Sequence, residues 1–173
     1  MTIRPILNAP NKILKSRSLN VPKVNDEIIM LLTDMLETMY NDDGIGLAAV
    51  QIGILKRVIV VDVTEQDTER KPLKLINPEI VWKSSNHDIY EEGCLSFPNY
   101  FAKISRATEI KIKYLNEKEN IEELTASGIL AVCIQHEIDH LDGKLFIDHL
   151  SLVKRNIILR KIAKARRVRD IKD

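Results

Sequence analysis

The chain has 173 residues, of which 45% are hydrophobic and 29% are charged. This composition is typical of a globular protein and excludes fibrous and disordered classes, and the length predicts a single domain. No apolar run approaches the roughly 18 residues that a membrane span needs, and the first residues show no signal peptide. We therefore expect a cytoplasmic protein without membrane association. Two cysteines cannot staple a domain of this size, so we expect them to serve metal or redox chemistry.

The charge is nearly balanced but unevenly distributed. Lys and Arg number 26 against 25 Asp and Glu, a net charge of +1. Residues 151–173 hold nine basic and two acidic residues (9 − 2 = +7), which leaves +1 − 7 = −6 for residues 1–150. The main body is therefore not a general nucleic-acid binder. The basic tail either meets an acidic partner or simply solvates the outer face of a helix.

Residues 25–40 are the first predicted helix, because Asn25 can cap it and an apolar face follows. Four segments rich in β-branched residues then predict strands, at residues 57–63, 73–82, 108–115 and 121–125.

A second helix is predicted over residues 127–141, with Ser127 as its N-cap and Gly143 just past its end. A last helix begins near Ser151. Because helices bracket the strands, we expect an α+β fold in which mostly antiparallel sheets pack around the second helix, followed by a C-terminal helix.

The strongest chemical signal is an H-E-x-x-H motif on that second helix. His136 and His140 are four residues apart, so both rings can face one metal ion. Glu137 is rotated by about 100° from His136 and can reach water beside the ion without filling its coordination shell. The motif predicts a catalytic metal site with three protein ligands and one open position.

The third ligand must come from elsewhere in the chain. Asp142, Asp148 and His149 lie too near the helix end to fold back without strain. Cys133 shares the ligand face but lies about 10 Å along the axis from His140, which favours a buried apolar role. Cys94 follows Gly93, whose small size lets the backbone approach an ion closely, and is the thiolate we expect to bind.

A glycine-rich segment, GIGLAAVQ, covers residues 44–51 and precedes the first predicted strand. It is not a phosphate loop, because it follows a helix and has Asp42 and Asp43 where phosphates would be repelled. Either it is a packing turn of small residues, or its backbone pairs with an extended ligand beside Gln51.

Three segments, GIGLAAVQ, EGCLS and QHEIDH, occur in this order and together resemble the peptide deformylase family over about residues 3–150. This family removes the formyl group from the N-terminal methionine of new proteins. The resemblance implies that residues 1–150 are the catalytic domain. It also implies an Fe²⁺ site that Ni²⁺ or Co²⁺ can occupy and Zn²⁺ occupies less well, with three ligands: Cys94, His136 and His140.

The resemblance further implies roles in the reaction. Glu137 would take a proton from the attacking water and pass one to the leaving amine. The side-chain amide of Gln51 and the backbone N–H of Leu95 would hold the developing oxyanion. The N-formylmethionyl peptide would pair with the backbone at Ile45 and Gly46.

The methionine side chain would enter an apolar pocket whose wall includes the ring of His136. Its other residues are Ile45, Tyr90, Ile129, Val132 and Cys133. Gly93 and Phe101 would lie beside the peptide. Phe101 stands where many family members have Arg or Tyr, and Tyr90 is bulkier than the usual aliphatic residue, which predicts a shorter pocket and a weaker polar anchor.

Two other functions fit parts of the pattern. An H-E-x-x-H motif also supports a metallopeptidase, and a basic tail with a structural metal would suit a non-catalytic ribosome-associated module. For the main hypothesis we expect a monomer whose tail, residues 151–173, packs as a helix on the catalytic domain and contacts the ribosome. In that helix, four apolar residues would face the body: Leu152, Ile158, Ile162 and Ala165. Four basic residues would face outward: Arg155, Lys161, Arg166 and Arg169.

Overall fold

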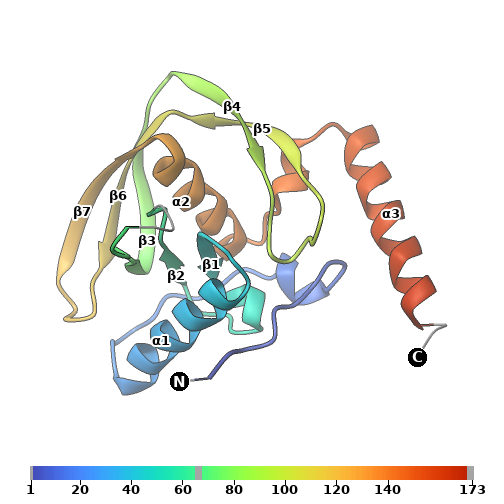
Figure 1. Ribbon diagram of the computed structural model, residues 1–173. Coiled ribbons are helices and arrows are strands. Elements are labelled where there is room, and N and C mark those ends of the chain that lie inside the picture. Colours follow the sequence, from blue (N-terminus) through green and yellow to red (C-terminus); the bar gives the residue numbers. More distant parts are fainter. Residues whose placement is uncertain (1, 65–67, 171–173) are drawn as a thin grey trace.

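The computed structural model describes residues 2–64 and 68–170, without the side chains of residues 166–170, so the expectations for Arg166 and Arg169 lie outside the described residues. Figure 1 shows one helix at the centre of the molecule, strands on several sides of it, and two further helices at the periphery. This is the α+β architecture that the sequence predicts.

The main sheet is antiparallel throughout, with strand order β1-β2-β3-β6-β7. Its strands are β1 (Gly46–Ala48), β2 (Val58–Val61), β3 (Leu73–Lys83), β6 (Glu109–Leu115) and β7 (Ile121–Ser127). All four segments predicted as strands lie in this sheet. The short strand β1 was not predicted, and it forms one edge because its only strand partner in the described chain is β2.

The first long helix, α1 (Asp26–Asn41), begins as the sequence predicts. The Asn25 side chain accepts a hydrogen bond from the backbone N–H of Ile28 at 3.1 Å, which satisfies a donor that the first turn leaves free. Its apolar face, including Leu32 and Met35, packs against β1 and β2 in one core cluster. This cluster supports one side of the segment that the sequence suggested for ligand pairing.

The central helix, α2 (Gly128–Leu141), is buried over most of its length. It packs against the main sheet through residues such as Ala131, Ile134 and Leu141. Ser127 is the N-cap residue, as the sequence predicts, but its side chain makes no capping hydrogen bond. Burial against the sheet, not local capping, therefore stabilises this helix.

A second sheet, of two strands, was missed from the sequence. It pairs β4 (His87–Glu92) with β5 (Ala102–Ala107), and the loop 93–101 joins them. Most side chains of β4 are exposed, and its sequence, HDIYEE, is mainly polar. The segment therefore lacks the alternation of apolar and polar residues that indicates a strand. The pair lies over α2 in Figure 1.

The C-terminal part consists of the short helix η3 (Phe146–His149) and α3 (Leu152–Asp170). Ile158 and Ile162 of α3 join a third core cluster with Phe97 and Phe146, as expected for the inner face. Leu152 was expected to face the body as well but is 73% exposed, and Ala165 is exposed. The apolar contact of α3 is therefore narrower than its sequence suggests. In residues 2–64 and 68–170, no helix combines the length and apolarity of a membrane span.

Gly143 and Gly128 offer a matched test of how the ends of α2 are built. Both have positive φ, 71° and 58°, but a Cβ on Gly143 would lie 2.4 Å from the Lys15 carbonyl oxygen, whereas a Cβ on Gly128 would meet nothing within 4 Å. We expect Gly128→Ala to cost about 1 kcal/mol of unfolding free energy and Gly143→Ala at least about 2 kcal/mol, since only the latter adds a backbone clash. Denaturant unfolding measures both, and equal losses would contradict the role of close packing at Gly143.

Candidate active site

One buried face of α2 carries the three residues of the H-E-x-x-H motif. His136, Glu137 and His140 are all nearly inaccessible to solvent. The ring centroids of His136 and His140 are 5.0 Å apart, as expected for residues one helical turn apart. Both imidazoles therefore face the same small volume.

Cys94, from the loop after β4, completes a group of potential metal ligands with His136 and His140. The Cys94 Sγ lies 3.2 Å from His140 Nε2, and the three ligand atoms lie within 4.8 Å of one another. Around a tetrahedral ion with Zn–N and Zn–S bonds of ordinary length, ligand atoms are about 3.6 Å apart, so this donor set fits a divalent ion with little adjustment.

The rival ligands considered from the sequence lie elsewhere. Cys133 Sγ donates to the Ile45 carbonyl oxygen at 3.4 Å, and burial raises the pKa of this thiol well above its ordinary value. Asp142 pairs with Arg57, Asp148 pairs with Lys15, and His149 folds back onto Asp139. In the described chain these groups have other partners and stand outside the ligand cluster.

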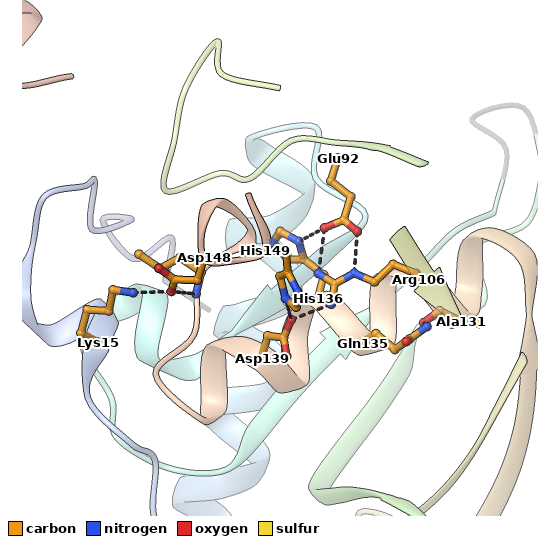
Figure 2. Close-up of polar contacts among 10 residues, drawn as sticks. Lys15, Glu92, Arg106, Ala131, Gln135, His136, Asp139, Asp148 and His149 are labelled. Carbon is orange, nitrogen blue, oxygen red and sulfur yellow. Dashed lines mark hydrogen bonds and ion pairs between the residues drawn. The ribbon is translucent and has the colours of Figure 1, made fainter. Parts of the chain in front are cut away.

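Charged side chains that sequence reasoning missed hold His136 in place (Figure 2). His136 Nδ1 lies 2.9 Å from Glu92 Oε2, and Glu92 accepts two hydrogen bonds from Arg106, at 2.6 and 2.9 Å. Arg106 also donates to Asp139 at 2.6 Å, and His149 Nε2 lies 2.7 Å from the same carboxylate. The chain of contacts joins β4, β5, α2 and η3.

This charge network keeps its carboxylates ionised. Burial alone would raise the pKa of Glu92, but the hydrogen bonds from Arg106 and His136 hold it below its ordinary value. Burial likewise opposes ionisation of Asp139, yet His149 and Arg106 lower its pKa to about 2. A carboxylate at Glu92 Oε2 accepts from Nδ1 of His136 and leaves Nε2 as the ligand nitrogen.

Gln51 reaches the ligand cluster from the 3₁₀ helix η2 (Ala49–Ile52). Its Oε1 accepts from the Ala48 backbone N–H at 2.8 Å, which orients the side-chain amide. Its Nε2 lies 3.2 Å from Ser96 Oγ and 3.6 Å from Cys94 Sγ. The amide donor is thus aimed at the space in front of the thiol.

A cavity of about 660 Å³ lies against these groups. Gln51, Cys94, Leu95, His136 and Glu137 line its chemical end. All eight residues expected to contact a substrate also line it: Ile45, Gly46, Tyr90, Gly93, Phe101, Ile129, Val132 and Cys133. The sequence-based residues therefore come together at one site, and Phe101, 66% exposed, stands at its mouth.

Two glycines make room in this cavity. A Cβ on Gly46 would lie 2.5 Å from Glu137 Oε1, and one on Gly93 would lie 2.6 Å from Phe101 Cε1. Both distances are far shorter than van der Waals contact. Any side chain at Gly46 would displace Glu137 from the cavity wall.

Glu137 is only 4% exposed, and its Oε2 has no hydrogen-bond partner in the described chain. Burial is the largest cause that raises its pKa, to about 7. A carboxyl group with this pKa can both accept and release a proton at neutral pH. The unpartnered oxygen indicates a group kept free for chemistry and not for structure.

Comparisons with known proteins show which family this chain resembles in sequence. A family model described as "Polypeptide deformylase" matches residues 3–156. Curated peptide deformylases from Rhizobium meliloti and Phenylobacterium zucineum are 45% and 52% identical, over 99% and 95% of this chain and 99% and 97% of theirs.

Solved structures agree in fold as well. Peptide deformylase from Ehrlichia chaffeensis in complex with actinonin superposes with a TM-score of 0.90 at 42% identity, over 95% of this chain and 98% of that one. The enzyme from Legionella pneumophila gives a TM-score of 0.89 at 39% identity, over 98% of both chains.

The charge network generates a stability prediction. Arg106 is 4% exposed between two carboxylates, so Arg106→Met leaves Glu92 and Asp139 buried without their shared cation. We expect a loss of about 3–5 kcal/mol of unfolding free energy. The control is Lys103→Met, an exposed position on the same strand, which should change stability by no more than about 0.5 kcal/mol. Denaturant titration measures both variants, and a loss of similar size in the two would refute the role of the buried ion pairs.

Proposed function

We propose a role in one reaction for each group that lines the cavity, because this chain belongs to the polypeptide deformylase family. Members of this family, and so this chain, are metal-dependent hydrolases that remove the N-terminal formyl group from nascent peptides. The observation that carries the proposal is the meeting of a thiol, two imidazoles and an unpartnered carboxyl group at one end of an apolar cavity. That arrangement favours hydrolysis of a small group at a chain end over cleavage within a bound protein, and over a purely structural metal.

The metal ligands in this proposal are Cys94, His136 and His140, and the ion is Fe²⁺. A thiolate beside two imidazoles suits ferrous iron, and Ni²⁺, Co²⁺ or Zn²⁺ can replace it because the same donors accept borderline ions. The bound ion supplies the Lewis acidity that makes water nucleophilic at neutral pH. Glu92 orients His136 through Nδ1 and thereby keeps the ligand nitrogen aimed at the site.

The substrate backbone adds to the free edge of β1. Because β1 pairs with β2 on one side only, its other edge can take an extended peptide beside Ile45 and Gly46. The Ile45 carbonyl oxygen already accepts from the Asp62 N–H at 2.9 Å, so the peptide pairs with the remaining backbone groups of this edge. The methionine side chain then fills the apolar part of the cavity, against Val132 and Cys133. This seats the formyl group in front of Cys94 and Gln51.

The oxyanion that forms when water attacks the formyl carbon accepts hydrogen bonds from Gln51 Nε2 and the Leu95 backbone N–H. In the described chain, the N–H of Leu95 has no other acceptor, and Gln51 is oriented by Ala48. Donors that are placed before the reaction stabilise the transition state without reorganisation. Glu137 takes the proton from water and delivers it to the amine nitrogen as the carbon–nitrogen bond breaks.

The role of Glu137 has a direct test. Glu137→Gln keeps the shape of the side chain but cannot accept the proton, so formate release from an N-formylmethionyl tripeptide should fall by about 10²- to 10⁴-fold. The assay is anaerobic, with iron-loaded wild type and variant of equal metal content and equal unfolding temperature. Wild-type activity should persist with nickel or cobalt in place of iron. A fully active Glu137→Gln enzyme would remove Glu137 from the mechanism.

We also propose that α3 docks on the ribosome, where the formylated chain emerges in the cytoplasm. Exposed apolar side chains at Leu152, Val153 and Ile157 lie on the same helix as exposed basic residues. A surface of this kind suits both ribosomal RNA phosphates and ribosomal protein. The inner face of α3 packs against the catalytic domain through Ile158 and Ile162, so the outer face remains available.

Deleting α3 would expose the core cluster that Ile158 and Ile162 cover and so change the stability of the protein. The test therefore uses charge substitutions on the intact helix. Four exposed basic residues of α3 are changed to Gln: Lys154, Arg160, Lys161 and Lys164. Ribosome affinity should drop, and the slope of log affinity against log salt should decrease by roughly three. The control makes the same charge change at exposed lysines elsewhere: Lys23, Lys103, Lys111 and Lys113. Equal effects of the two sets would contradict docking through α3.

A further inference from the structure

A second cavity adjoins the active site and has no role in the proposed reaction. Its volume is about 840 Å³, and it lies between the N-terminal segment, the loop 93–101 and α3. Ile162 and Ala165 provide the wall from α3, and Asn8 lies on the opposite side. In Figure 1 the loop between β4 and β5 extends toward the N-terminal segment, with α3 beyond it.

The two cavities share one stretch of chain as a common wall. Residues 97–100 line both of them, and Pro98 and Asn99 are exposed between the two. A peptide that leaves the active site past Phe101 therefore needs only to cross this exposed turn to enter the second cavity. A backbone hydrogen bond from Ala9 N–H to the Ser96 carbonyl oxygen, at 2.9 Å, ties the turn to the N-terminal wall.

The lining of the second cavity suits an uncharged, extended ligand. Among the side chains that the structure describes, which exclude those of residues 166–170, Lys12 is the one charged group in its lining, whereas another large cavity, near the end of α2, is lined by eight charged residues. A described lining with one charge gives a polyanion little to bind. The lining instead offers amide side chains beside proline and apolar residues, and in the described chain the amides of Asn8 and Asn99 have no hydrogen-bond partner. Free amides can both donate to and accept from a peptide backbone.

We propose that this cavity binds the backbone of the nascent chain downstream of the residues held in the active site. Nascent chains share a backbone but no fixed sequence, so a site that recognises them all must use main-chain groups, and unpaired amides provide such contacts. The occupant is the substrate itself, because residues 97–100 form a wall of both this cavity and the one that holds the start of the substrate. This inference rests on the proposed deformylase site and adds a second contact region to it.

The first experiment varies substrate length. Formate release is measured with N-formylmethionyl peptides of three, six and ten residues that carry only alanine, serine and glycine after methionine. For the wild-type enzyme we expect KM to fall about five- to tenfold between the shortest and longest peptide, with kcat unchanged, equivalent to one or two net hydrogen bonds. A KM that stays constant within about twofold overturns the inference. Activity on the tripeptide tests the deformylase site separately, so the two proposals cannot fail together unnoticed.

The second experiment blocks the cavity. Ala165 lines it and is exposed, so Ala165→Trp fills it without disturbing the core, and Ala163→Trp places the same side chain on an exposed position of α3 outside the lining. Ala165→Trp should remove the KM advantage of the ten-residue peptide and leave the KM for the tripeptide unchanged. Ala163→Trp should keep the KM advantage of the ten-residue peptide. Asn8→Ala, which removes an amide without adding bulk, should weaken the advantage as well. An advantage that persists in both Ala165→Trp and Asn8→Ala places the downstream chain elsewhere.

Discussion

The orientation of His136 in the Cys-His-His cluster depends on the buried guanidinium of Arg106. It joins Glu92 on the neighbouring strand to Asp139 on α2, and through Glu92 it reaches the ring of His136. Burying such charges is expensive, and apolar residues of similar size would stabilise a core at least as well. The ion pairs instead fix orientation, because bidentate hydrogen bonds from Arg106 set the direction of the Glu92 carboxylate and through it that of the His136 ring. The small sheet of β4 and β5 brings Glu92 and Arg106 into position, and the loop that carries Cys94 follows directly from β4.

Glu137, at the wall of the cavity, is buried without the charged partners that Glu92 has. Glu137 is as deeply buried as Glu92, yet no cation or hydrogen-bond donor contacts its Oε2 in the described chain. Burial therefore shifts its pKa upward, whereas the pKa of Glu92 is shifted downward by its partners. Two glutamates near the Cys-His-His cluster thus differ in charge state, Glu92 being held as an anion and Glu137 having a pKa near neutral pH, as the proposed proton transfer requires. The absent side chain of Gly46 keeps the second one at the wall of the cavity.

The C-terminal helix connects three features that the sequence presents as separate. Its inner face packs through Ile158 and Ile162, and Arg155 contacts Asp148 next to His149, the last residue of the charge network. One edge of it, at Ala165, lines the second cavity, and its outer face carries exposed basic and apolar residues. If the outer face binds the ribosome as proposed, α3 would hold the second cavity beside the emerging peptide. Docking and substrate binding then use different sides of the same element.

The sequence by itself determined the parts of the protein that depend on local spacing. The helical period placed His136 and His140 on one face, Asn25 marked the start of α1, and β-branched segments predicted four strands of the main sheet. The family motifs also indicated the residues that line the cavity. The sequence also favoured Cys94 over Cys133, and the structure places Cys94 beside both histidines. Only the tertiary structure revealed β4 and β5 and brought Glu92, Arg106 and His149 to α2. These features rest on contacts between residues far apart in the sequence, such as the 44 positions between Glu92 and His136, which no local pattern encodes. They form only when burial in a shared core makes it costly to leave each charge or ligand without its partner.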